Sequence, residues 1–158
     1  MKQAALARWL RIAAGMVAVM GVVVCVLAMP GVGFHADQPL EPTWYRVLYS
    51  VSVWILAAPC YIALAIFLRI VREIGRDNSF CHENAARLRV IGILALCDTG
   101  AAFIAIIAFF LLDILALNFL PLGFCLIVAG LGIAVVSFTL SHLVDKAVVL
   151  KEENDGTI

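Results

Sequence analysis

One acidic side chain, Asp98, lies well inside a long apolar stretch, where its chemistry would differ most from that in water. It lies nine positions after Arg89, the last basic residue before the stretch. On a helix that separation corresponds to roughly 13 Å. Because an ionised carboxylate is costly in an apolar medium, we expect Asp98 to face protein or water, to pair, or to keep its proton.

The helix face that carries Asp98 contains several small residues. Helical spacing places six residues on this face: Ile91, Ala95, Asp98, Ala102, Ala105 and Phe109. Small side chains allow helices to approach closely, so we predict that Asp98 points toward a neighbouring helix. Its candidate hydrogen-bond partners there are hydroxyl groups, those of Ser52, Tyr61, Ser137, Thr139 and Ser141.

Two interpretations of Asp98 are open. With Ser137 and Thr139 it would form a proton, cation or ligand site, which is the default hypothesis for an acid inside a membrane. Alternatively, it makes an interhelical hydrogen bond that fixes packing. We favour packing, because no second charge lies well inside any apolar stretch.

A second set of polar residues follows the second apolar stretch, between residues 69 and 89. We predict that helix continues to Ile74 and stops at Gly75, and that a new helix follows with Glu83 in its first turn. The candidate contacts for a soluble partner in this loop are Arg72, Arg76, Phe80, Glu83 and Asn84. The alternative for the arginines is topological anchoring and contact with anionic lipid.

The C-terminal segment, residues 145–158, is charged. We expect the last helix to continue through Leu150, with the residues beyond it either solvated or docked on a partner. The candidates for docking are Glu152, Glu153, Asn154 and Asp155.

The chain lacks the patterns of a metal, cofactor or catalytic site. His82-Glu83 resembles the start of a zinc-protease helix, but Ala86 stands where a second His ligand is required. The five cysteines include no C-x-x-C pair and suit small apolar fillers. Paired catalytic carboxylates and a nucleophile–base pair are also missing. We therefore expect no metal, no cofactor and no enzymatic activity.

Four apolar stretches must position these residues. Of 158 residues, 65% are hydrophobic and 14% are charged, whereas a soluble domain is about half apolar and a quarter charged. Each stretch is close to the ~20 residues that a helix needs to cross a bilayer. Since a backbone in lipid must satisfy its own hydrogen bonds, we predict spanning helices at residues 12–29, 45–68, 90–112 and 119–144.

The basic residues lie almost entirely on one side of these spans. Ten of the eleven lysines and arginines share that side, and only Arg46 falls on the other. The positive-inside rule assigns the basic side to the cytoplasm. The prediction is an all-α integral membrane protein with one membrane domain, an antiparallel four-helix bundle. Both termini, the loop at 69–89 and the tail at 145–158 are expected in the cytoplasm.

The first span has an alternative interpretation. A basic start and an apolar stretch that ends in Val26-Leu27-Ala28 resemble a cleaved signal peptide. The apolar stretch is longer than the about 7–15 residues typical of a signal peptide, which favours a retained span.

Motif-like residues occur in the loop and the tail: Gly75, Phe80, Glu83, Asn84, Leu88 and Gly92, then Glu152, Glu153, Asn154, Asp155, Thr157 and Ile158. In these motifs and in its span layout the chain resembles a family of small bacterial four-helix membrane proteins, catalogued as domain of unknown function 2975. The family usually has Ser or Thr where this chain has Cys81, and an apolar residue where it has Gly156. Cys81 is a poorer helix N-cap than Ser or Thr, so we expect the helix to start at Ser79 instead.

The resemblance implies a place in the bacterial inner membrane and a soluble partner. Members of such families are often encoded beside a small Cro-type helix-turn-helix regulator. This implies a non-enzymatic regulatory or scaffold protein that binds the regulator through its cytoplasmic loop and tail.

The alternative function is a subunit of a small transporter or channel that uses Asp98 as a proton or cation site. Four helices are too few for most carriers, so this alternative requires a homo-oligomer. The chain has no basic patch with interleaved aromatic residues, and we expect no direct binding of nucleic acid.

Overall fold

The protein consists of four long helices, in a computed structural model that describes residues 3–29, 43–75, 81–112 and 119–155. The helices are α1 (Gln3–Leu27), α2 (Thr43–Ile74), α3 (His82–Leu111) and α4 (Phe119–Asp155). All four are long and apolar enough to cross a membrane. The prediction of an all-α protein with four membrane-spanning helices is confirmed at this level.

The helices extend beyond the apolar stretches that predicted them, chiefly at the basic end of each span. α1 begins at Gln3, before the span predicted from residue 12, and α4, which was expected to continue through Leu150, ends at Asp155. Lys, Arg, Glu and Ala are good helix formers, so helix continues where hydropathy falls. The 37 residues of α4 extend for about 55 Å at ~1.5 Å per residue, well beyond the ~30 Å of a hydrocarbon core.

α2 ends where the sequence predicted. Its last residue is Ile74, and the N–H of Gly75 donates to Val71 O at 3.2 Å. α1 packs closely here, because a Cβ atom added to Gly75 would lie 3.2 Å from Ala7 Cβ. The helix also continues through Pro59.

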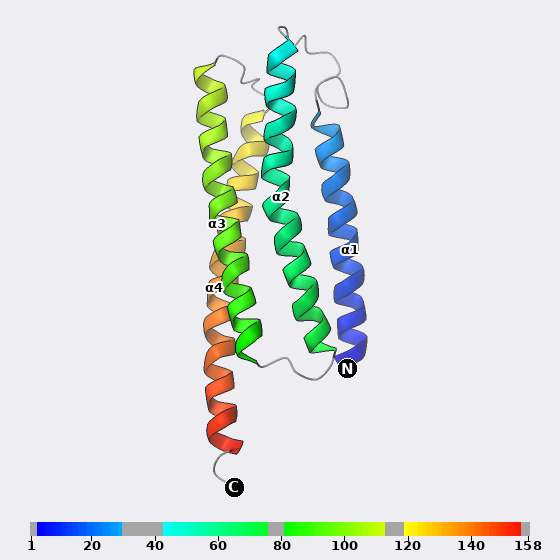
Figure 1. Cartoon of the computed structure of the whole chain (residues 1–158), viewed down its shortest axis with the longest axis vertical. Coiled ribbons are helices and arrows are strands. Elements are labelled where there is room, and N and C mark those ends of the chain that lie inside the picture. Colours follow the sequence, from blue (N-terminus) through cyan, green and yellow to red (C-terminus); the bar gives the residue numbers. More distant parts are fainter. Residues whose placement is uncertain (1–2, 30–42, 76–80, 113–118, 156–158) are drawn as a thin grey trace.

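The helices pack in a row that follows chain order (Figure 1). α1 contacts α2, α2 contacts α3, and α3 contacts α4, while no contact joins α1 to α4 among the described residues. The interface between α3 and α4 is the most extensive of the three. Figure 1 also shows that α4 reaches beyond the other helices at the end where α1 begins.

Glycine permits the close approach of α3 and α4. A Cβ atom added to Gly130 of α4 would overlap Thr99 Oγ1 of α3. Further along the same interface, the ring of Phe138 on α4 lies against Gly92 on α3. These contacts fix the register of α4 along α3, and so they decide where the charged end of α4 meets the start of α3.

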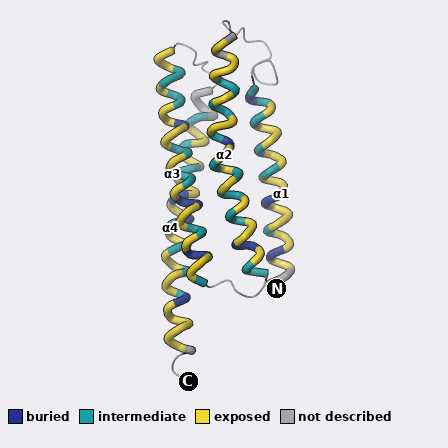
Figure 2. Tube along the Cα trace, viewed as in Figure 1, coloured by how far each residue is buried: buried dark blue, intermediate teal, exposed yellow. Residues whose placement is uncertain are grey.

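Buried positions gather toward the end where α1 begins and α4 ends (Figure 2). The two largest fully buried side chains, Val71 of α2 and Asn84 of α3, both lie there. Many large apolar side chains elsewhere are exposed, as at Phe110 and Leu111. Soluble monomers rarely expose such continuous apolar surface, so these faces suit contact with lipid acyl chains.

Candidate functional site

Asp98 lies on a face of α3 that packs against α2. On the same stripe Ile91 is buried, and the ring of Phe109 lies 5.8 Å from that of Tyr49 on α2, measured between centroids. The Cys60 thiol of α2 donates a hydrogen bond to Asp98 Oδ2, with 3.3 Å between sulfur and oxygen. Asp98 therefore pairs across the contact between α2 and α3.

The other carboxyl oxygen of Asp98 has no such partner. Oδ1 is buried, and within the described ranges it is the one buried side-chain oxygen or nitrogen without a hydrogen bond. Cys60 follows Pro59, whose ring nitrogen cannot donate to the carbonyl of Ile55 as a helical N–H would. The α2–α3 contact thus holds an acid and a thiol, and the thiol directly follows the proline that interrupts the backbone hydrogen bonds of α2.

Ser137 and Thr139 are not hydrogen-bonded to Asp98 in this structure. Thr139 is exposed on α4, and its hydroxyl donates to Val135 O of the same helix at 2.8 Å. Ser137 is buried on α4, but the hydrogen bond described for Asp98 goes to Cys60. The structure therefore joins the acid to α2 and leaves the two predicted α4 partners elsewhere.

The other three hydroxyl candidates also bond elsewhere. Those of Ser52, Tyr61 and Ser141 donate to backbone carbonyls of α2, α1 and α3, respectively. Cys60 was not predicted as a partner, because a thiol in an apolar stretch usually indicates packing. The register of α2 against α3, which decides the pairing, depends on side chains from two distant parts of the sequence.

One histidine joins the start of α3 to the end of α4. His82 Nδ1 lies 2.9 Å from Asp145 Oδ1, and His82 Nε2 lies 3.7 Å from Glu152 Oε1. Asp145 and Glu152 are seven residues apart, so they share one face of α4 about two turns apart. We call these three residues the His82 clasp. The sequence predicted Glu152 as a contact residue but not His82 or Asp145.

The first turns of α3 are tied together by a buried amide. Asn84 is only 1% exposed, and its Oδ1 accepts a hydrogen bond from Arg87 Nη1 at 3.0 Å. Arg87 Nη2 also pairs with Glu83 Oε2 at 3.0 Å. Ser141 of α4 donates to Ala85 O of α3 at 2.8 Å. The bonds of Arg87 lie within α3, and that of Ser141 joins α4 to the start of α3.

α3 starts at His82, with Cys81 as its N-cap, rather than at Ser79 as expected. Cys81 has an extended backbone, with φ −142° and ψ 150°, and makes no side-chain capping bond. Its carbonyl accepts hydrogen bonds from the N–H groups of Asn84 and Ala85 at 3.1 and 3.3 Å. Backbone bonds and the burial of Asn84 and Ala85 set the start of this helix, so a strong capping side chain is not required.

Most of the predicted contact residues are exposed: Arg72, Glu83, Glu152, Glu153 and Asn154. Asn84 differs, because its side chain is in the interior and is not presented to a partner. Arg76 and Phe80 lie outside the described residues, and Asp155 is the last residue of α4. In the described ranges, no group of three or more His, Cys, Asp or Glu side chains is placed to hold a metal ion.

A family model described as Protein of unknown function (DUF2975) matches residues 32–158. The chain belongs to this family. The match contains α2, α3 and α4 of this DUF2975 protein and begins after α1. No curated protein and no solved structure matches the chain.

The loop motif of this DUF2975 protein is largely explained by packing. Gly75 lies against α1, Gly92 lies against Phe138, Asn84 is buried, and Glu83 pairs with Arg87. The motif therefore shapes the end of the molecule on which the His82 clasp is built.

Proposed function

We propose that the protein is a non-enzymatic regulatory or scaffold protein of the bacterial inner membrane. Its four spans run antiparallel, with both termini in the cytoplasm. Its cytoplasmic end binds a small soluble helix-turn-helix regulator through the start of α3 and the end of α4. The observation that carries the proposal is the His82 clasp, which makes one surface of two segments that are far apart in the sequence.

The charge of the α4 end supports a basic partner. Between residues 145 and 155, acidic side chains outnumber basic ones: Asp145, Glu152, Glu153 and Asp155 against Lys146 and Lys151. A DNA-binding regulator is basic on the face that contacts phosphates. Opposite charge steers that face toward the α4 end, so binding there would keep the regulator from DNA.

The packing beneath this surface supports a docking role as well. Val71 and Asn84 are fully buried at this end of the row, and Ser141 joins α4 to α3. A surface that is already ordered loses less conformational entropy when a partner binds.

The proposal is tested by co-precipitation of the full-length protein in detergent with the helix-turn-helix regulator encoded beside it. The wild-type protein should retain the regulator, and a variant that lacks residues 151–158 should not. Lys146→Gln is the matched control, because it removes one exposed charge of α4 outside the clasp, and it should retain the regulator. No retention by the wild type, or unchanged retention after the deletion, contradicts the proposal.

The buried Oδ1 of Asp98 favours a second candidate function. In a homo-oligomeric transporter or channel, an unpaired carboxyl oxygen within a span is where a proton or a cation would bind. Proton and alkali-cation flux into proteoliposomes tests this function. Asp98→Asn should abolish flux, whereas Cys60→Ser, which keeps a donor for Oδ2, should not. Absence of wild-type flux, or flux that Asp98→Asn leaves unchanged, rules the transport function out.

A further inference from the structure

A shallow groove of about 250 Å³ lies between α2 and α3, toward the basic end of both helices. It is lined by Ile66 and Arg69 of α2 and by Ala86, Arg87 and Val90 of α3. Pockets that enclose a small molecule usually measure about 300–1,000 Å³. The groove therefore suits one polar group at the surface, with apolar atoms beside it, better than a whole enclosed solute.

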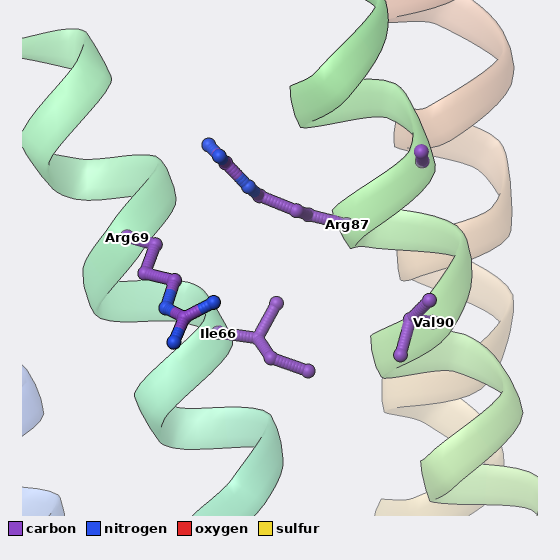
Figure 3. A pocket seen from close by; sticks show the side chains of 5 residues that line it. Ile66, Arg69, Arg87 and Val90 are labelled. Carbon is purple, nitrogen blue, oxygen red and sulfur yellow. The ribbon is translucent and has the colours of Figure 1, made fainter.

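Arg87 extends from α3 into the space between α2 and α3, whereas the side chain of Arg69 lies over the ribbon of α2 in the view of Figure 3. Arg69 is exposed, and the ion pairs of the described ranges do not include it. Arg87 is oriented by Asn84 Oδ1 and Glu83 Oε2, each 3.0 Å from one of its terminal nitrogens. A guanidinium carries five N–H donors, so these two bonds hold Arg87 in place and leave donors for a ligand.

We propose that this groove binds the phosphodiester headgroup of an anionic phospholipid, with an acyl chain along Ile66 and Val90. Guanidinium groups match the geometry of phosphate oxygens, and two arginines line this groove. Arg69 directly follows the apolar stretch of α2, and Arg87 shortly precedes that of α3, which is the depth at which headgroups lie. Basic pockets between spanning helices are a general form of anionic-lipid site.

The neighbouring groove between α3 and α4 has a different charge pattern. Its volume is about 420 Å³, and its lining includes Arg89 but also the carboxylate of Asp145. Asp145 belongs to the lining of that groove, whereas Glu83, the acid paired with Arg87, is not among the residues that line the groove between α2 and α3. An acid in the lining disfavours an anion next to Arg89. Arg89 is therefore a matched control for Arg69, since it carries the same charge on the same end of the row in a different groove.

The test is lipid binding by the full-length protein in detergent, measured by native mass spectrometry. The probes are phosphatidylglycerol and phosphatidylcholine with identical acyl chains, and inorganic phosphate as a competitor. The wild type should retain phosphatidylglycerol over phosphatidylcholine. Arg69→Gln should weaken phosphatidylglycerol binding about fivefold, as expected for one basic side chain at an anionic headgroup. Arg89→Gln should leave that binding within about twofold, and inorganic phosphate should not displace the lipid.

Three results would overturn the proposal. Equal binding of the two lipids would mean that the headgroup is not recognised. Equal losses in Arg69→Gln and Arg89→Gln would mean that binding reflects the overall charge of this end and not the groove. Displacement by inorganic phosphate would mean that the groove is a small-anion site and holds no lipid.

Discussion

His82, the first residue of α3, lies 2.9 Å from Asp145 of α4, measured from Nδ1 to Oδ1. The contact connects residues that are 63 positions apart in the chain. Both side chains are 57% exposed, and exposed ion pairs contribute only about 0–1 kcal/mol to stability. The importance of this pair is therefore positional, because it connects the charged end of α4, whose register the packing of α3 and α4 sets, to the first residue of α3.

Removal of the imidazole should loosen the end of α4 without unfolding the protein. We expect His82→Ala to speed amide hydrogen exchange in residues 145–155 and to lower the free energy of unfolding by less than about 1 kcal/mol. Hydrogen exchange with mass spectrometry measures the first effect. His142→Ala is the control, since His142 is exposed on α4 and lies outside the clasp. The same acceleration in both variants would show that the clasp does not hold the helix end.

Loss of the Cys60 thiol should destabilise the α2–α3 contact. Cys60→Ala removes the hydrogen bond to Asp98 Oδ2 and leaves both carboxyl oxygens without a described donor, so we expect a loss of about 1–3 kcal/mol. Cys60→Ser keeps a donor and should stay close to the wild type. Unfolding in detergent with increasing denaturant gives these values.

Cys97→Ala is the control for the thiol itself. Cys97 of α3 is, like Cys60, a free and exposed cysteine, but the hydrogen bond to Asp98 belongs to Cys60, so the loss of the Cys97 thiol should change stability by less than about 0.5 kcal/mol. If Cys60→Ala and Cys97→Ala have equal effects, the hydrogen bond to Asp98 contributes nothing measurable.

A methyl group at Gly130 should separate α3 from α4. We expect Gly130→Ala to destabilise the protein by about 1–3 kcal/mol, because the new Cβ would overlap Thr99 Oγ1. Gly132→Ala, where no neighbouring atom lies within 4 Å, should be neutral or stabilising by up to about 1 kcal/mol. The double variant Gly130→Ala/Thr99→Ala should recover much of the loss, as a double-mutant cycle in denaturant would reveal. Strictly additive effects would argue against this contact.

The buried amide of Asn84 should matter more than the exposed carboxylate beside it. Asn84→Ala removes the acceptor for Arg87 from a fully buried position and should cost about 1–3 kcal/mol. Glu83 is 76% exposed in its pair with Arg87, so Glu83→Ala should cost less than about 1 kcal/mol. Unfolding midpoints of the two variants provide the comparison, and the reverse order would contradict the structure.

The helices themselves could be predicted from hydropathy and a few end signals. The apolar stretches located all four helices, and Gly75 marked the end of α2 as predicted. Hydropathy underestimated helix length, because a helix needs only its backbone bonds and good helix formers to continue into water. The charged end of α4 is the clearest example, since it remains helical to Asp155.

The side-chain pairs between helices could not be predicted in the same way. The small-residue stripe of α3 gave a face for Asp98, but it did not indicate whether Cys60 or Ser137 would meet it. That choice depends on register, which is set by interlocking contacts such as Gly130 against Thr99. Asn84 shows the related difficulty that a polar residue in a charged loop looks exposed, whereas the fold buries it.

The most direct test of the central claim is the affinity of the proposed helix-turn-helix partner for the full-length protein in detergent. It is measured for the wild type, His82→Ala and the variant without residues 151–158. If the start of α3 and the end of α4 form one docking surface, both changes should weaken binding, because His82→Ala keeps every residue of the tail but removes its contacts with the first residue of α3. If His82→Ala binds as tightly as the wild type while the deletion abolishes binding, the tail acts alone and the joint surface is refuted.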